Sequence, residues 1–189
     1  MAEEKLKFKG AGWKPIIEFV KVTFGEEGFN RVLESVSPEC REIANGWVLI
    51  SSWYDMQLIE EFIKATDRLL GKGDLDIARK MGRYSAEFGI KTVYKFLMKV
   101  GTPGFVLKRA PIIWSRYYSK GKLQIVLLKP GHAILRLTDM GTLSEVTCVR
   151  VTGWMEMTMK MSGAKNPSVE HISCPSRGDS FEEWEGRWQ

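Results

Sequence analysis

Cysteine and histidine are scarce in this chain, which has three cysteines and two histidines among 189 residues. Cys40, Cys148 and Cys174 are odd in number and form no CxxC pair. This argues against a disulfide framework and favours a reducing compartment, so we expect a cytoplasmic protein. His132 and His171 have no serine or cysteine at a spacing typical of a catalytic triad. The sequence therefore indicates no catalytic residue, and we expect a protein that is not an enzyme.

Long hydrophobic runs are absent as well. None approaches the roughly 18 residues that a membrane span requires. The first eight residues are too charged for the hydrophobic region of a signal peptide. Hydrophobic residues nevertheless make up 44% of the chain, which suits a buried core. We expect a single domain over residues 1–189 without a membrane span.

Acidic residues are almost missing from the middle of the chain. Between Arg79 and Lys122 there are eleven basic residues and one acidic residue, Glu87. Such a stretch is either an ordinary solvated face or a docking surface for an anionic group or an acidic protein partner. No nucleic-acid recognition motif accompanies it, so nucleic acid is not an expected partner. The residues that we expect on a docking surface are Lys91, Lys95, Lys99 and Arg116.

The first part of the chain has the periodicity of helices. Apolar residues at helical spacing predict helices from residue 13 to 24 and from 26 to 35, and a further turn after Ser37-Pro38. Asp55 is the expected N-cap of a helix that Gly71 ends, and another helix follows Asp74. The run Trp47–Trp53 fits either a strand or a connecting segment. These elements predict a helical layer over about residues 12–118.

The last part of the chain predicts two hairpins with a helix between them. Alternating residues from 122 to 127 and from 132 to 137 predict one hairpin, closed at Pro130-Gly131. A helix from Ser144 to Met161 is apolar on most of its circumference. Strands from Val169 to Cys174 and from Phe181 to Trp188 follow it. We therefore predict an α+β fold, with several N-terminal helices packed on a small antiparallel sheet of β-β-α-β-β order over about residues 121–188.

Several short motifs resemble known families. Gly82-Arg83, Gly89, Lys91-Thr92-Val93-Tyr94 and Trp114-Ser115-Arg116-Tyr117-Tyr118 resemble an uncharacterised family found mainly in myxobacteria and related bacteria. Cys148, Gly153-Trp154, His171-x-x-Cys174 and Gly178-Asp179 resemble the 4-vinyl reductase domain. That domain belongs to the fold shared by haem-nitric-oxide-binding sensors and Bet-type Golgi tethering subunits. The resemblance implies helices on a small sheet around a largely apolar cavity, and usually a homodimer.

The chain departs from the 4-vinyl reductase pattern at one position that concerns metal binding. The pattern has a third cysteine where this chain has Glu182, and the three cysteines imply a metal or thiol site. Cys148, Cys174 and Glu182 are acceptable zinc ligands, but a fourth is not evident. His171 and Cys174 are three residues apart in a predicted strand, so they face opposite sides unless a bulge intervenes. We expect buried structural residues here, with metal binding as the alternative.

The departures from the haem-binding relatives are larger. The resemblance implies a histidine on a helix as the iron ligand, but both histidines of this chain are in predicted strands. The relatives also hold the haem propionates with a tyrosine, serine and arginine pattern. Here Tyr118-Ser119-Lys120 lacks the arginine two positions beyond the serine. Arg116 and Arg150 can meet a carboxylate, although arginines of a basic surface need no such explanation.

Aromatic residues just before the first hairpin are the best candidates for a pocket. They lie where helices should meet the sheet, and they bring hydroxyl and indole donors to an apolar wall. The full candidate set is Tyr94, Trp114, Tyr117, Tyr118, Trp154 and Met157.

We therefore expect a sensory or regulatory module that holds a hydrophobic or amphipathic small molecule between helices and sheet. One alternative is a dimeric protein-interaction scaffold with a filled core. Another is a tetrapyrrole-modifying enzyme or haem sensor. The sequence contains no motif that names a ligand or a cofactor.

Overall fold

The structure is a computed structural model that describes residues 5–92 and 102–189. The described helices are α1 (Gly10–Glu34), α2 (Pro38–Asn45), α3 (Met56–Leu70), α4 (Asp76–Thr92), α6 (Pro103–Leu107), α7 (Ala110–Tyr117) and α8 (Glu145–Met161), with a 3-10 turn at Pro175–Arg177. The strands are β1 (Lys7–Lys9), β2 (Trp53–Asp55), β3 (Lys122–Lys129), β4 (His132–Thr138), β5 (Ser168–Ser173) and β6 (Glu182–Arg187).

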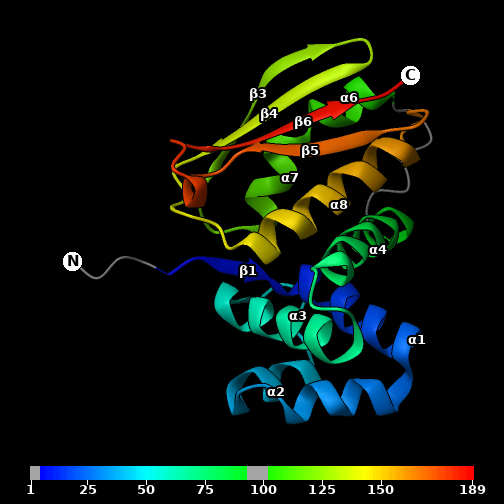
Figure 1. The fold of residues 1–189 in the computed structure, drawn as a ribbon, viewed down its shortest axis with the longest axis vertical. Coiled ribbons are helices and arrows are strands. Elements are labelled where there is room, and N and C mark those ends of the chain that lie inside the picture. The colour runs from blue at the N-terminus through cyan, green and yellow to red at the C-terminus, as the bar shows by residue number, and fades with distance from the viewer. Residues whose placement is uncertain (1–4, 93–101) are drawn as a thin grey trace.

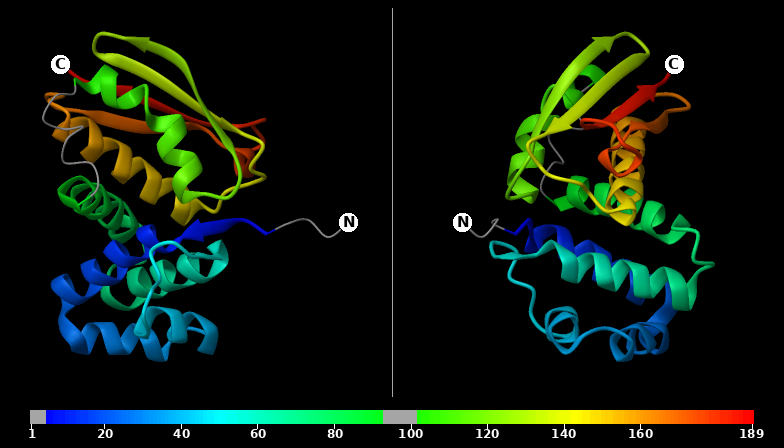
Figure 2. Two further views of the ribbon diagram at one scale, coloured as in Figure 1. Left: turned by 180° about the vertical axis from the view of Figure 1, so that it is seen from behind. Right: turned by 60° about the vertical axis from the view of Figure 1, so that its left-hand side comes forward.

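The main sheet has four strands in the order β3-β4-β6-β5, and every neighbouring pair is antiparallel. Strands β1 and β2 form a separate two-stranded sheet. Figures 1 and 2 show α1, α2 and α3 gathered at one end of the molecule and the main sheet at the other, with α4 and α8 between them. The predicted α+β fold and the β-β-α-β-β order of its C-terminal half are confirmed.

Local signals account for most of the element boundaries. Gly25 has a φ of 70° inside α1, a conformation that favours glycine, so α1 is two helices joined at a kink, as the periodicity predicts. Asp55 caps α3 by accepting a hydrogen bond from the Gln57 N–H at 2.9 Å, and α3 ends before Gly71. The ambiguous run from residue 47 to 53 is mostly irregular, and only Trp53 enters strand β2.

Helices α4 and α8 cross at very close range because glycines face each other at the crossing. A Cβ atom on Gly82 would clash with the carbonyl oxygen of Arg150, and one on Gly153 would clash with the carbonyl oxygen of Arg79. Beside these contacts, Glu156 of α8 pairs with Arg79 at 2.8 Å and with Arg83 at 2.6 Å. The crossing therefore fixes how α8 is presented to the space between the helices and the sheet.

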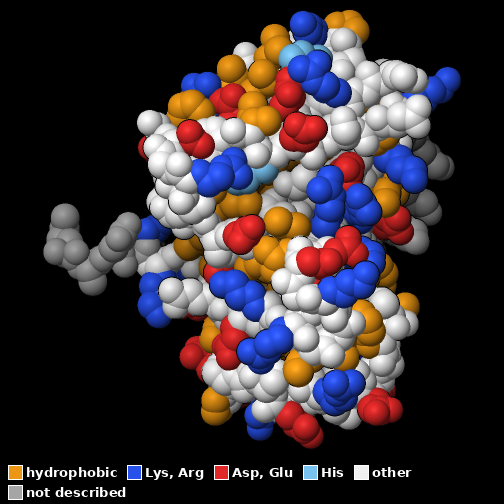
Figure 3. All heavy atoms as spheres, in the orientation of Figure 1, with side chains coloured by type: hydrophobic (Ala, Val, Ile, Leu, Met, Phe, Trp, Pro, Cys, Tyr) orange, Lys and Arg blue, Asp and Glu red, His pale blue; other side chains and the backbone are white. Residues whose placement is uncertain are grey.

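The surface carries charges of both signs. Figure 3 shows Lys and Arg side chains interspersed with Asp and Glu side chains across the visible face. Within the basic stretch, Lys80 pairs with Asp76 at 2.6 Å and Lys122 with Asp139 at 2.8 Å. In the part of the chain that the structure describes, no helix combines the length and the hydrophobicity needed to cross a membrane.

Candidate functional site

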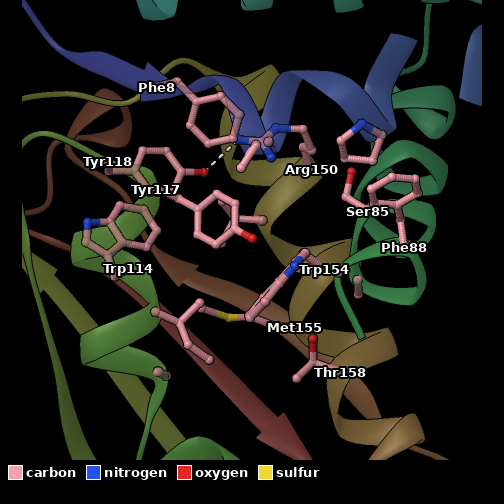
Figure 4. A pocket seen from close by; sticks show the side chains of 18 of the residues that line it. Phe8, Ser85, Phe88, Trp114, Tyr117, Tyr118, Arg150, Trp154, Met155 and Thr158 are labelled. Atoms are coloured by element: carbon pink, nitrogen blue, oxygen red, sulfur yellow. Dashed lines mark hydrogen bonds between the residues drawn. The ribbon is translucent and has the colours of Figure 1, made fainter. Parts of the chain in front are cut away.

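A cavity of about 270 Å³ lies between the helices and the main sheet. Its walls come from Phe8 and Pro15 near the N-terminus, Phe88 on α4, Leu107 on α6 and Leu135 on β4, together with side chains of α7 and α8. Most of these groups are apolar, and Figure 4 shows many of them converging on one space. Sites of roughly 300 to 1,000 Å³ are typical for small molecules, so this cavity suits a compact ligand.

Four of the predicted pocket residues line this cavity: Trp114, Tyr117, Tyr118 and Trp154. Met157 does not line it, because the cavity side of α8 carries residues spaced by about one helical turn, among them Trp154, Met155 and Thr158. The other candidate, Tyr94, lies outside the described residues. Whether the four lining residues contact a ligand remains a prediction.

Two of these aromatic rings form a stacked pair. The rings of Trp114 and Tyr118 have centroids 3.9 Å apart and an interplanar angle of 9°. The Trp114 Nε1–H donates to the carbonyl oxygen of Lys120 at 3.1 Å. The stacking with Tyr118 and this hydrogen bond together fix the position of the indole. Burial raises the pKa of Tyr118 above its usual value, although Arg150 acts against this increase. Tyr118 therefore stays protonated and neutral at physiological pH.

Arg150 is unusual among the residues that line the cavity, because its charged side chain is buried. It belongs to α8, lines the cavity, and is only 3% exposed. Its Nη2 donates to the Tyr118 hydroxyl at 2.6 Å, as Figure 4 shows, and its guanidinium carbon lies 4.7 Å from the centroid of the Phe8 ring. Its Nε–H is buried and has no hydrogen-bond partner among the described residues, and the same holds for the hydroxyl of Thr158 at another part of the wall.

The interpretation of Arg150 as a surface arginine was wrong. The signal that identifies it is in the sequence, because the helix around it is apolar on most of its circumference and leaves little exposed surface for a charge. Phe8, Ser85 and Thr158 also line the cavity and were not candidates. They come from elements far apart in the sequence, which only the tertiary fold brings together.

A second group of side chains, which could act as metal ligands, lies on the other side of α8. Cys148, His171, Cys174 and Glu182 place their ligand atoms within 4.8 Å of one another. The His171 Nε2 lies 2.7 Å from a Glu182 carboxylate oxygen, and the Cys148 thiol donates to the same oxygen at 3.8 Å. Burial, and then the Glu182 carboxylate, raise the pKa of the Cys148 thiol strongly.

A bulge in β5 explains why His171 joins this group. The pairing of β5 with β6 shifts register between His171 and Ser173. Such a bulge changes which side of the sheet the following residue faces. The bulge is the exception under which His171 and Cys174 were expected to share a side, and the predicted set Cys148, Cys174 and Glu182 gains a fourth member.

The predicted docking surface is only partly described. Arg116 is exposed on α7 and does not line the cavity. The side chain of Lys91 and the whole of Lys95 and Lys99 lie outside the described residues. A docking role for these four residues remains a prediction.

Comparisons with known proteins identify the fold. No protein-family model matches the chain, and none of the curated proteins is similar to it in sequence. Solved structures do match. An H-NOX protein from S. oneidensis in the Fe(II)NO state has a TM-score of 0.73 at 13% identity, with 96% of this chain and 99% of that chain covered. The chain has the H-NOX fold.

Two further H-NOX structures agree. The H-NOX domain from Shewanella oneidensis in the Fe(II)CO state has a TM-score of 0.72 at 16% identity, covering 96% of this chain and 98% of that one. A mutant H-NOX protein from K. algicida in the unliganded Fe(II) state has a TM-score of 0.72 at 11% identity, covering 96% of both chains. The expected relation to the haem-nitric-oxide-binding fold is confirmed for the fold. The resemblances to the 4-vinyl reductase domain and to the myxobacterial family remain predictions.

The residues of this chain do not fit a haem held by histidine, which the H-NOX fold implies. The only two histidines are on strands β4 and β5 and neither lines the cavity. The His132 Nε2 lies 2.6 Å from a Glu185 carboxylate oxygen, and His171 belongs to the cysteine group. The Ser119 hydroxyl accepts a hydrogen bond from the Lys7 backbone N–H at 2.9 Å, and Gly121 stands two positions beyond it in place of an arginine.

Proposed function

We propose that this protein is a sensory or regulatory module that binds a hydrophobic or amphipathic small molecule in the cavity between its helices and its sheet. The observation that carries the proposal is an apolar cavity with a buried, incompletely paired polar group, Arg150. A scaffold with a filled core would leave no such space. The H-NOX structures with similar folds are described in Fe(II)NO and Fe(II)CO states, so this fold accommodates small ligands in other proteins.

Binding of a neutral apolar dye tests this proposal without assuming a head group. Nile red should gain fluorescence with the wild-type protein and bind at about one molecule per chain. Ala86 is buried on α4 and lines the cavity, so Ala86→Phe should fill part of the space and abolish dye binding while the far-UV circular dichroism remains unchanged.

Ser115→Phe is the matched control, because Ser115 is exposed on α7 and does not line the cavity. This variant should bind the dye as the wild type does. Equal dye binding by the wild type and Ala86→Phe would contradict the proposal, since the dye would then occupy another surface.

A second proposal concerns the cysteine group: Cys148, His171, Cys174 and Glu182 hold one zinc ion. Two thiolates, an imidazole and a carboxylate are all ordinary zinc ligands, and four of them complete a structural site. Ligands of one tetrahedral zinc lie roughly 3.3 to 3.8 Å apart, so a contraction of about 1 Å would close the site around the ion. Zinc binding would deprotonate the two thiols and link α8 to the hairpin of β5 and β6.

Metal analysis tests this second proposal. After removal of metal and dialysis against zinc, the wild type should retain about one zinc per chain by mass spectrometry of the metal, and Cys148→Ala should lose it. Cys40→Ala is the control, because Cys40 is also fully buried but lies outside the group. Zinc retention that is equal in the two variants would contradict the assignment.

A further inference from the structure

Arg150 is a buried positive charge that cannot be removed by proton loss, because a guanidinium stays protonated in proteins. The side chain is 3% exposed, so water does not solvate it. The Tyr118 hydroxyl and the face of the Phe8 ring compensate for part of the lost hydration. Neither group carries a negative charge, and within residues 5–92 and 102–189 the Nε–H has no acceptor.

No acidic residue of the described chain pairs with Arg150. The acid with an electrostatic effect on the neighbouring Tyr118 is Glu60 on α3, and its carboxylate accepts a hydrogen bond from the Thr147 hydroxyl at 2.6 Å. Residues 93–101 contain neither aspartate nor glutamate, and the acids outside the described residues are Glu3 and Glu4. A buried charge that has no counterion among the described residues is strongly unfavourable, so entry of an anion would lower the free energy of the protein.

We propose that the ligand is a carboxylic acid with an apolar body, and that its carboxylate pairs with Arg150. This inference rests on the proposed ligand-binding function. A carboxylate matches the planar donors of one guanidinium in two parallel hydrogen bonds, and its single negative charge balances the single positive charge of Arg150. A phosphate monoester brings a larger charge that the apolar wall does not compensate.

The surrounding groups orient such a ligand. Because the Tyr118 hydroxyl accepts its hydrogen bond from Arg150, its own proton is available to the ligand carboxylate. From Arg150 the cavity wall on α8 continues through Trp154 and Met155 to Thr158, and Figure 4 shows these side chains between the two polar ends. The helix rises about 12 Å over the eight steps from Arg150 to Thr158, so the wall suits a medium-length apolar body.

A comparison of two ligands that differ only in the head group tests the inference. Decanoic acid and decan-1-ol are titrated into the full chain at pH 7.5 by calorimetry. The wild type should bind the acid at least about tenfold more tightly than the alcohol, because a charge-assisted hydrogen bond to Arg150 is available only to the acid.

Variants assign the preference to Arg150. Arg150→Met should reduce the preference for the acid to about twofold or less and leave alcohol binding in place. Arg68→Met removes an exposed arginine at the end of α3 and should keep the full preference.

The outcomes separate the two proposals. Equal affinity of the wild type for acid and alcohol would overturn the carboxylate inference and leave the ligand-binding proposal intact. Failure of both ligands and of Nile red would overturn both. If Arg150→Met does not fold, the wild-type comparison still decides the inference, and Arg150→Lys should retain a reduced preference for the acid because it keeps the charge but loses the paired donors.

Discussion

At the scale of single residues, the properties of the cavity come from side chains whose energetic effect depends on how deeply they are buried. Arg150 has the same chemistry as exposed arginines such as Arg68 and Arg116, but at 3% exposure its charge requires an explanation. Trp114 and Tyr118 are ordinary aromatic residues whose stacking places a hydroxyl next to that charge. The apolar helix around Arg150 is a sequence signal for its burial, but its hydrogen bond to Tyr118 depends on the tertiary fold.

The stacked pair gives a prediction. Trp114→Phe removes the indole N–H that donates to Lys120 and part of the stacking surface, so we expect a loss of about 1 to 2 kcal/mol in the free energy of unfolding. Because Tyr118 loses its support beside the cavity, Nile red should also bind several-fold more weakly. Urea unfolding and dye titration measure the two effects.

The control for Trp114 is Trp13, which is fully buried and does not line the cavity, and whose indole N–H has no partner in the part of the chain that the structure describes. Trp13→Phe should leave dye affinity unchanged. If both variants weaken dye binding equally, Trp114 acts as general core and not as a wall of the binding site.

At the scale of elements, the crossing of α4 and α8 holds the cavity in shape. Facing glycines allow the close approach, and the partly buried carboxylate of Glu156 joins two arginines of α4. Burial alone would raise the pKa of Glu156, but hydrogen bonds from Arg79 and Arg83 outweigh burial and lower it. The ionised carboxylate therefore stabilises the crossing.

This pKa shift predicts a pH dependence. A carboxyl group with a lowered pKa in the folded state stabilises the protein above its unfolded pKa of about 4.3, and the contribution is lost as the pH falls through the folded value. Glu156→Gln should lower the free energy of unfolding by about 1 to 2 kcal/mol at pH 7, a range reduced because the arginines are partly exposed. The difference from wild type should shrink toward pH 3.5 in urea unfolding.

Asp76→Asn is the comparison for Glu156, since the Asp76–Lys80 pair is about half exposed on both sides. Exposed pairs contribute little, so its effect should stay below about 0.5 kcal/mol at pH 7. An effect of Glu156→Gln that is equally small, or independent of pH, would show that the arginine pairs do not stabilise the crossing.

Helices and strands that depend on residues close in sequence are the ones that the sequence predicts correctly. The first hairpin, α8 and the Asp55 cap depend on residues close in sequence, and alternation and capping identify them correctly. Strands β1 and β2 have three residues each and pair across more than forty positions, so local patterns contain no trace of them. The bulge in β5 depends on its register with β6, which no local pattern records.

At the scale of the whole molecule, the chain keeps the H-NOX fold at 11 to 16% identity to solved structures. The same architecture surrounds a cavity, yet the polar groups of that cavity do not fit a histidine-bound haem. Folds carry different functions through differences in a few site residues. The single domain, the homodimer, the acidic protein partner and the cytoplasmic location remain predictions.

Native mass spectrometry of the protein purified from its own host, compared with its denatured mass, would show directly whether the cavity holds a ligand. We expect a non-covalent adduct of one small molecule per chain, released on denaturation and identified as a carboxylic acid with an apolar body. The Ala86→Phe variant should carry no adduct. A protein that is free of adduct and also fails to bind Nile red or decanoic acid would show that the cavity is not a ligand-binding site.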